Sequence, residues 1–117
     1  MNRYGYGKAA PKPAVHSVPR GIYRDGLRDI ARKLWENKRD HGLNPYLAVH
    51  VKGPSVAHPG GMIYEGAKTD GWQTAFEDGK DVEYFCCGHN ALCTDGKDHH
   101  FYLKLKVDEI VFIQVLN

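Results

Sequence analysis

Hydrophobic residues recur with a helical period between residues 21 and 41. The spacing places five apolar side chains on one face of an α-helix, namely Tyr23, Leu27, Ile30, Ala31 and Leu34. Glycine is common just after the last turn of a helix, so Gly42 is a plausible end. The Asn44-Pro45 pair that follows does not continue a helical backbone. The pattern therefore predicts one long helix over residues 21–41.

Later segments alternate apolar and polar residues, as strands with one buried face do. Residues 46–52 and 101–107 show this alternation, whereas residues 110–116 are apolar on nearly every position. The last pattern is typical of a central strand that is covered on both faces. Shorter strands are expected at residues 62–65 and 82–87.

The segments after these two short strands, residues 66–81 and 88–99, are polar and are predicted to be loops. Two aromatic side chains are expected to anchor the first loop to the core, Trp72 and Phe76. An α+β fold follows. It has one long N-terminal helix packed on a mostly antiparallel sheet of about 4–5 strands, and an extended arm precedes it.

The arm comprises residues 1–20, where Pro11, Pro13 and Pro19 disfavour helix and central strand and no apolar period is present. Residues 21–117 are expected to form a single domain, because a chain of 117 residues is of ordinary domain length. The arm adds nothing to a core, so it is a candidate for contact with a partner.

The formal net charge of +2 is small, but the charges are unevenly distributed. Residues 1–52 carry 11 Lys and Arg against 4 Asp and Glu, and residues 53–117 carry 5 against 10. Such asymmetry suits contact with an oppositely charged partner or head-to-tail contact between copies. The three clustered cysteines and the absence of an apolar leader or membrane span favour a reduced compartment, the cytoplasm or the inside of a virion.

Cysteine and histidine side chains cluster near residues 86–100, which raises the possibility of a zinc site. Zinc takes four thiolate or imidazole ligands, and one choice that spacing allows is Cys86, His89, Cys93 and His99. The segment lacks a pair of Cys-x2-Cys knuckles. The alternative is that Cys86 is a buried residue at the end of a strand and that His99 and His100 are exposed.

The sequence also contains residues for two catalytic arrangements. A cysteine nucleophile would pair Cys86 or Cys87 with His50 as its base, but no long supporting helix is expected there. A metal-independent ribonuclease would use His50, Lys52 and His58 for acid–base chemistry and charge stabilisation. A helix followed by an antiparallel sheet is a layout shared by several small ribonucleases, although layout alone does not imply function.

Cations interleaved with aromatic residues continue from the arm onto the predicted helix. This partner-binding set comprises Arg3, Tyr4, Tyr6, Lys8, Lys12, Arg20, Arg24, Arg28 and Arg32. Such residues can track a phosphate backbone or lie in an acidic groove of a protein. The alternative is a solvated helix face, partly neutralised by Asp25 and Asp29.

The leading hypothesis is a non-catalytic binding protein that a virus or mobile element encodes. It would dock on a larger protein or nucleoprotein assembly, or on a second copy, through the arm and the arginine stripe. The ribonuclease and a zinc-stabilised nucleic-acid-binding module are the alternatives. We expect no membrane partner and, apart from zinc, no cofactor.

Overall fold

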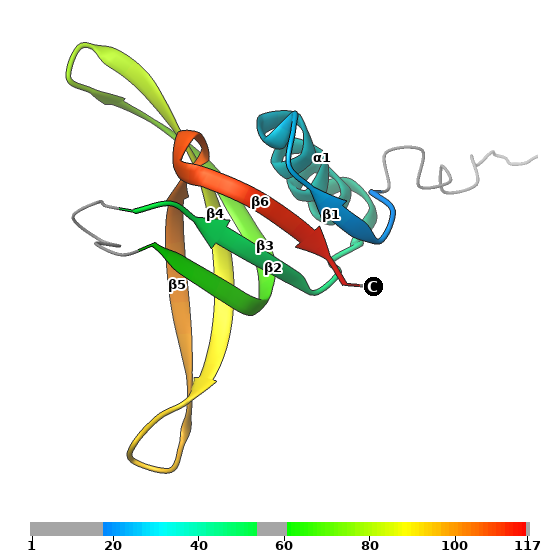
Figure 1. The fold of residues 1–117 in the computed structure, drawn as a ribbon, viewed down its shortest axis with the longest axis vertical. Coiled ribbons are helices and arrows are strands. Elements are labelled where there is room, and N and C mark those ends of the chain that lie inside the picture. Colours follow the sequence, from blue (N-terminus) through cyan, green and yellow to red (C-terminus); the bar gives the residue numbers. More distant parts are fainter. Residues whose placement is uncertain (1–17, 54–60, 117) are drawn as a thin grey trace, which may run out of the picture.

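The computed structural model describes residues 18–53 and 61–116. Within them lie one α-helix, α1 (Leu27–His41), a 3-10 turn, η1 (Val107–Glu109), and six strands (Figure 1). The strands are β1 (Gly21–Tyr23), β2 (Leu47–Val51), β3 (Met62–Glu77), β4 (Lys80–Leu92), β5 (Asp98–Lys106) and β6 (Ile110–Val115). Their order in the sheet is β1-β6-β2-β3-β4-β5, and every neighbouring pair is antiparallel. The α+β class is confirmed, but the expected count of 4–5 strands is wrong, because the described residues form six.

The helix begins at Leu27, six residues later than the apolar pattern predicted. Gly21–Tyr23 instead forms β1 and pairs with β6. Gly26 stands before the helix with φ 61°, a left-handed conformation that glycine adopts without steric cost and that separates strand from helix. Tyr23 still packs on the core that the helix covers, but it does so from the strand.

The core lies between α1 and one face of the sheet. Ala31 and Leu34 of the helix are buried there, as the apolar stripe predicted. The alternation predicted for residues 46–52 is also confirmed, since three β2 side chains are fully buried in this core, Leu47, Val49 and Val51. Phe85 of β4 is fully buried in the same cluster and joins the β3–β5 part of the sheet to the helix side.

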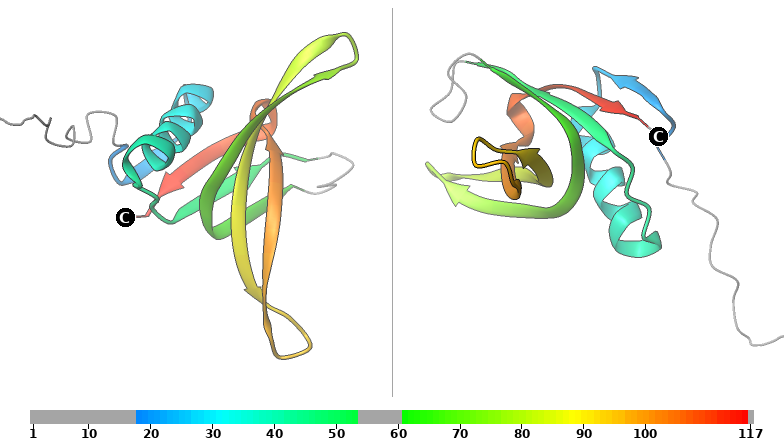
Figure 2. Two further views of the ribbon diagram at one scale, coloured as in Figure 1. Left: turned by 180° about the vertical axis from the view of Figure 1, so that it is seen from behind. Right: turned by 90° about the horizontal axis from the view of Figure 1, so that it is seen from below.

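The sheet bends along β3, which pairs with β2 through its first part and with β4 through its second (Figure 2). Gly66 lies at this change of partner with φ 75°, beside an irregularity in the β2–β3 register. A glycine in the left-handed region is a common bulge residue that bends a strand. The bend turns β3, β4 and β5 into a three-stranded wing on one side of the molecule.

Two long hairpins extend from this wing in opposite directions, β3–β4 and β4–β5 (Figures 1 and 2). The predicted loops at residues 66–81 and 88–99 are therefore largely wrong, because most of these residues belong to strands. Asp78 and Gly79 connect β3 to β4 with positive φ angles of 51° and 80°, the backbone of a tight two-residue hairpin turn.

The two aromatic residues predicted to anchor the first loop differ in outcome. Trp72 packs against the core, where the guanidinium of Arg32 lies 5.2 Å from its ring centroid. Phe76 is 75% exposed near the hairpin turn, so that part of the prediction is wrong. The strand carries Phe76 past the end of the core, which leaves most of the side chain exposed.

β6 was expected to be covered on both faces, but within residues 18–53 and 61–116 the helix covers only one. The opposite face borders an open hollow of about 520 Å³ whose lining includes Ala48, Ile63 and Phe112.

No helix in the described ranges is long and apolar enough to cross a membrane.

Candidate functional site

The predicted arginine stripe is largely engaged within the molecule. Arg28 forms a two-pronged ion pair with Glu83 of β4, at 2.6 and 2.8 Å. Arg32 bonds to Glu36, and its guanidinium lies over Trp72. Arg24 precedes the helix, so the three arginines do not form one helical stripe, contrary to the prediction.

Of the other residues in the predicted partner-binding set, the structure describes Arg20 and Arg24. Arg20 is exposed just before β1, and the Arg24 guanidinium lies 5.3 Å from the ring centroid of Phe112. The arm residues of the set lie outside the described residues, namely Arg3, Tyr4, Tyr6, Lys8 and Lys12. Their role stays a prediction.

The three residues predicted for a ribonuclease are not seen as one site. His50 lies on the sheet face opposite the helix, where its ring meets Phe112 edge to face at 5.2 Å. Lys52 is exposed beyond the end of β2, and His58 lies outside the described residues. The geometry gives no support to a centre built on His50.

The predicted zinc ligands are dispersed along the β4–β5 hairpin. Cys86 and His89 are three residues apart on one strand, so they point to opposite faces. His89 Nε2 lies 2.9 Å from the carbonyl oxygen of Glu65, and His99 Nε2 lies 2.8 Å from Asp95. Cys93 is about 20 Å of extended strand away from Cys86. Across the described ranges, no three His, Cys, Asp or Glu side chains gather in a way that would hold a metal ion.

The cysteines also lack the environment of a nucleophile. All three are free thiols, and Cys87 is fully buried. Burial raises the pKa of both Cys86 and Cys87, which disfavours the reactive thiolate. The cysteine–histidine pair with His50 therefore gains no support either.

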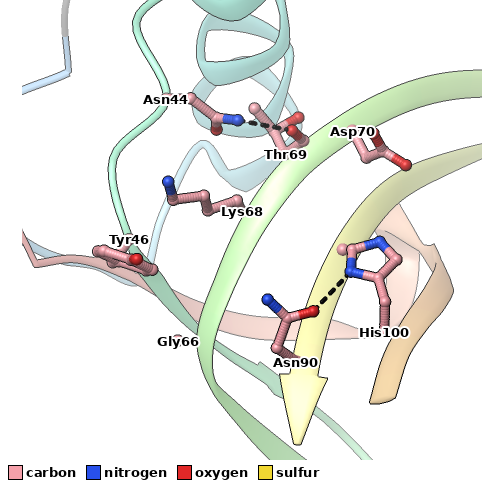
Figure 3. Close-up of a pocket in the computed structure, with 9 residues that line it drawn as sticks. Asn44, Tyr46, Gly66, Lys68, Thr69, Asp70, Asn90 and His100 are labelled. Carbon is pink, nitrogen blue, oxygen red and sulfur yellow. Dashed lines mark hydrogen bonds between the residues drawn. The ribbon is translucent and has the colours of Figure 1, made fainter. Parts of the chain in front are cut away.

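The structure instead gathers polar side chains in a pocket of about 210 Å³ on the exposed face of the wing (Figure 3). We call it the Lys68 pocket. Its lining comes from the segment after α1 and from β3, β4 and β5, and comprises Asn44, Tyr46, Gly66, Lys68, Thr69, Asp70, Gly88, Asn90 and His100. The β4–β5 register aligns Asn90 with His100, and the β3–β4 register aligns Lys68 with Gly88.

His100 is held in one orientation within this pocket. Its Nδ1 lies 2.7 Å from Oδ1 of Asn90 (Figure 3), and because that oxygen can only accept, Nδ1 is the donor. In the neutral ring, Nε2 is then the nitrogen with a free lone pair. The ring also lies against Gly88, where an added Cβ would approach His100 Cε1 to 2.7 Å. A residue without a side chain at position 88 is thus required for this placement.

Opposite charges line the pocket on β3. The Lys68 ammonium lies 4.5 Å from the centroid of the Tyr46 ring, a favourable cation–π distance. The Asp70 carboxylate accepts a hydrogen bond from the Tyr102 hydroxyl, and this bond raises the pKa of Tyr102. Asp70 is therefore already partnered, whereas the Lys68 ammonium rests on an aromatic face.

The inner wall of the pocket carries two unpaired polar atoms. Asn44 Nδ2 donates to the carbonyl oxygen of Thr69 at 3.1 Å. Asn44 Oδ1 and Thr69 Oγ1 are buried without a hydrogen-bond partner among the described residues. Buried polar atoms of this kind are uncommon, and a bound water or ligand atom would satisfy them.

A second lysine lies close to the pocket on the same face. Lys104 of β5 pairs with Cys86, and its ammonium lies 4.4 Å from the centroid of the Tyr84 ring. The Tyr84 hydroxyl donates to the Glu77 carboxylate at 2.6 and 2.8 Å, which raises the pKa of Tyr84 to about 12. This bond fixes the ring on which Lys104 rests.

Little in the sequence pattern indicates this pocket. Its lining residues are distributed over four segments, and because the sequence predicts loops at residues 66–81 and 88–99, it does not indicate that Lys68, Asn90 and His100 share one face. Comparisons of the chain with protein-family models, with curated proteins and with solved structures found no match.

Proposed function

We propose that this chain is a non-catalytic binding protein and that the Lys68 pocket holds a negatively charged group of its ligand. The observation that carries the proposal is the convergence of the Lys68 ammonium, the Tyr46 ring and the Asn90 amide on one pocket. A cation beside hydrogen-bond donors attracts phosphate or carboxylate. The lining also contains one carboxylate, that of Asp70, which already accepts a hydrogen bond from Tyr102.

The sequence-based proposal of docking on a larger assembly or a second copy is retained for the N-terminal arm. The arginine stripe is a weaker candidate for contact with a partner, because Arg28 and Arg32 already have partners within the molecule. The pocket face is a better candidate, since its lysines rest only on aromatic rings in the described structure.

Lys68→Ala is expected to weaken the binding of adenosine 5′-monophosphate by at least about tenfold, as for the loss of a charge-assisted contact worth about 1.5–3 kcal/mol. The measurement is an NMR titration of the folded protein. Lys33→Ala, an equal charge change on the exposed face of α1, is the control and is expected to bind like the wild type. Equal affinities of Lys68→Ala and the wild type, or no binding by the wild type at millimolar nucleotide, would contradict the proposal.

A metal-independent ribonuclease is the second candidate, and His100 rather than His50 is the observation that favours it. Its fixed Nδ1–H leaves Nε2 to take or give a proton, and Lys68 in the same pocket can stabilise phosphorane charge. One proton-transfer group and one cation are thus present in one place, whereas a second acid–base group has no histidine counterpart in the pocket lining.

RNA incubated with the protein and EDTA between about pH 5 and 8, the range in which histidine commonly titrates, separates the two candidates. The binding proposal predicts no cleavage. Cleavage that His100→Gln abolishes, while His99→Gln at the neighbouring exposed position retains it, would replace the binding protein with an enzyme.

A further inference from the structure

We infer that the ligand of the Lys68 pocket is a single strand of nucleic acid, which continues from the pocket across the exposed face of β3, β4 and β5. This inference rests on the proposed function and names its ligand class. The pocket itself, at about 210 Å³, is smaller than a typical site for a whole small molecule. It is suited to one group of a longer ligand.

The face beside the pocket continues the same chemistry. The strand registers align Lys68 with Gly88 and Gly88 with Tyr102, so these residues form one row across the wing. The next row on β4 and β5 pairs Cys86 with Lys104. Cations and aromatic rings therefore extend from the pocket over adjacent rows of one face.

The tyrosines differ in what they offer to a ligand. Tyr102 is 75% exposed, its hydroxyl lies beside Asp70, and its ring meets that of His100 in a T-shaped contact with 5.3 Å between the centroids. Tyr46 is 47% exposed beside Lys68. Exposed rings held next to cations are the features by which proteins stack the bases and neutralise the phosphates of single strands.

Asp70, beside Tyr102, is the one carboxylate in the lining of the pocket, and most other described carboxylates of the wing lie away from the centre of this face. Glu83 faces the helix and pairs with Arg28. Other acidic residues occupy the two hairpin ends, namely Glu77, Asp78, Asp81, Asp95 and Asp98. The centre of the face therefore carries Lys68 and Lys104 against the single carboxylate of Asp70, although the C-terminal half of the chain is acidic overall. An acidic peptide would use these lysines but would gain little from Tyr102, which favours nucleic acid as the ligand.

The test compares short single-stranded RNA and DNA with adenosine 5′-monophosphate and a poly-glutamate peptide, by fluorescence anisotropy and competition. A strand is expected to bind more tightly than the mononucleotide. Its affinity should fall with salt, and each of Lys68→Ala and Lys104→Ala should reduce the log–log salt slope by about 0.7, the contribution of one phosphate contact on a single strand.

Tyr102→Ala is expected to weaken strand binding by about fivefold or more, the lower end for a base stacked on an aromatic side chain. Phe76→Ala is the matched control, since Phe76 is equally exposed on the same wing but near a hairpin turn. If Tyr102→Ala and Phe76→Ala bind alike, the inference is wrong.

The outcomes separate this inference from the proposed function. Mononucleotide binding with no gain for a strand, or equal binding of poly-glutamate, overturns the inference and leaves the proposed function standing. Strand binding that Lys68→Ala does not weaken overturns the assignment to the pocket. Failure of every probe to bind overturns both.

Discussion

Replacing Phe85 with alanine is expected to lower the free energy of unfolding by about 3–5 kcal/mol, the usual cost of truncating a buried phenylalanine. Phe85 is fully buried, and its ring lies 6.4 Å from that of Trp72. It belongs to the cluster that holds β4 and β5 against the helix side of the sheet. Since domains of this size are stable by about 5–15 kcal/mol, the loss would remove a large part of the total.

Urea unfolding followed by circular dichroism measures this loss. Phe76→Ala provides the control, because the same chemical change is made on a side chain that is 75% exposed. It should alter stability by less than about 0.5 kcal/mol. If the two variants lose similar stability, the assignment of Phe85 to the core is wrong.

Gly88→Ala is expected to weaken ligand binding at the Lys68 pocket by at least about tenfold, or about 1.4 kcal/mol. The added Cβ would lie 2.7 Å from His100 Cε1 and 3.1 Å from Nε2, so the imidazole must leave its place. His100 would lose its bond to Asn90, and one wall of the pocket would change shape. The protein should stay folded, because the ring is exposed and is free to swing outward.

Gly71→Ala is the matched control for this substitution. Gly71 lies on β3 of the same wing, and a Cβ there would meet Cys86 Cβ at 3.6 Å, an ordinary contact. Neither glycine has a positive φ, so backbone strain does not distinguish the two variants. Titration with adenosine 5′-monophosphate should show a loss in Gly88→Ala alone. Unchanged affinity in Gly88→Ala would mean that His100 does not shape the site.

The parts of the fold that were predicted correctly from sequence are those that bury one face. Burial in a core requires apolar residues at regular spacing, and this spacing can be recognised in the sequence. It predicted the burial of Ala31 and Leu34 in α1 and of the inward side chains of β2. The long hairpins were missed for the converse reason. Beyond the core both faces of β3 and β4 are largely exposed, so no alternation marks them, and β1 is only three residues long.

The candidate site was less accessible to sequence reasoning than the fold. The sequence predicts histidines as metal ligands or as partners of Lys52, whereas the structure places His99 against Asp95 and His50 against Phe112. His100 lies in the pocket because the β4–β5 register pairs it with Asn90. Register depends on the complete sheet, so no local motif reports it.

The measurement that tests the central claim most directly is an amide chemical-shift map of the isotope-labelled protein titrated with a short single-stranded RNA. We predict saturable shifts centred on Lys68, Asn90 and His100, extending to Tyr102 and absent from the outer face of α1. Shifts that centre on α1, or a spectrum that does not change, would contradict the assignment of the exposed β3–β5 face as the binding surface.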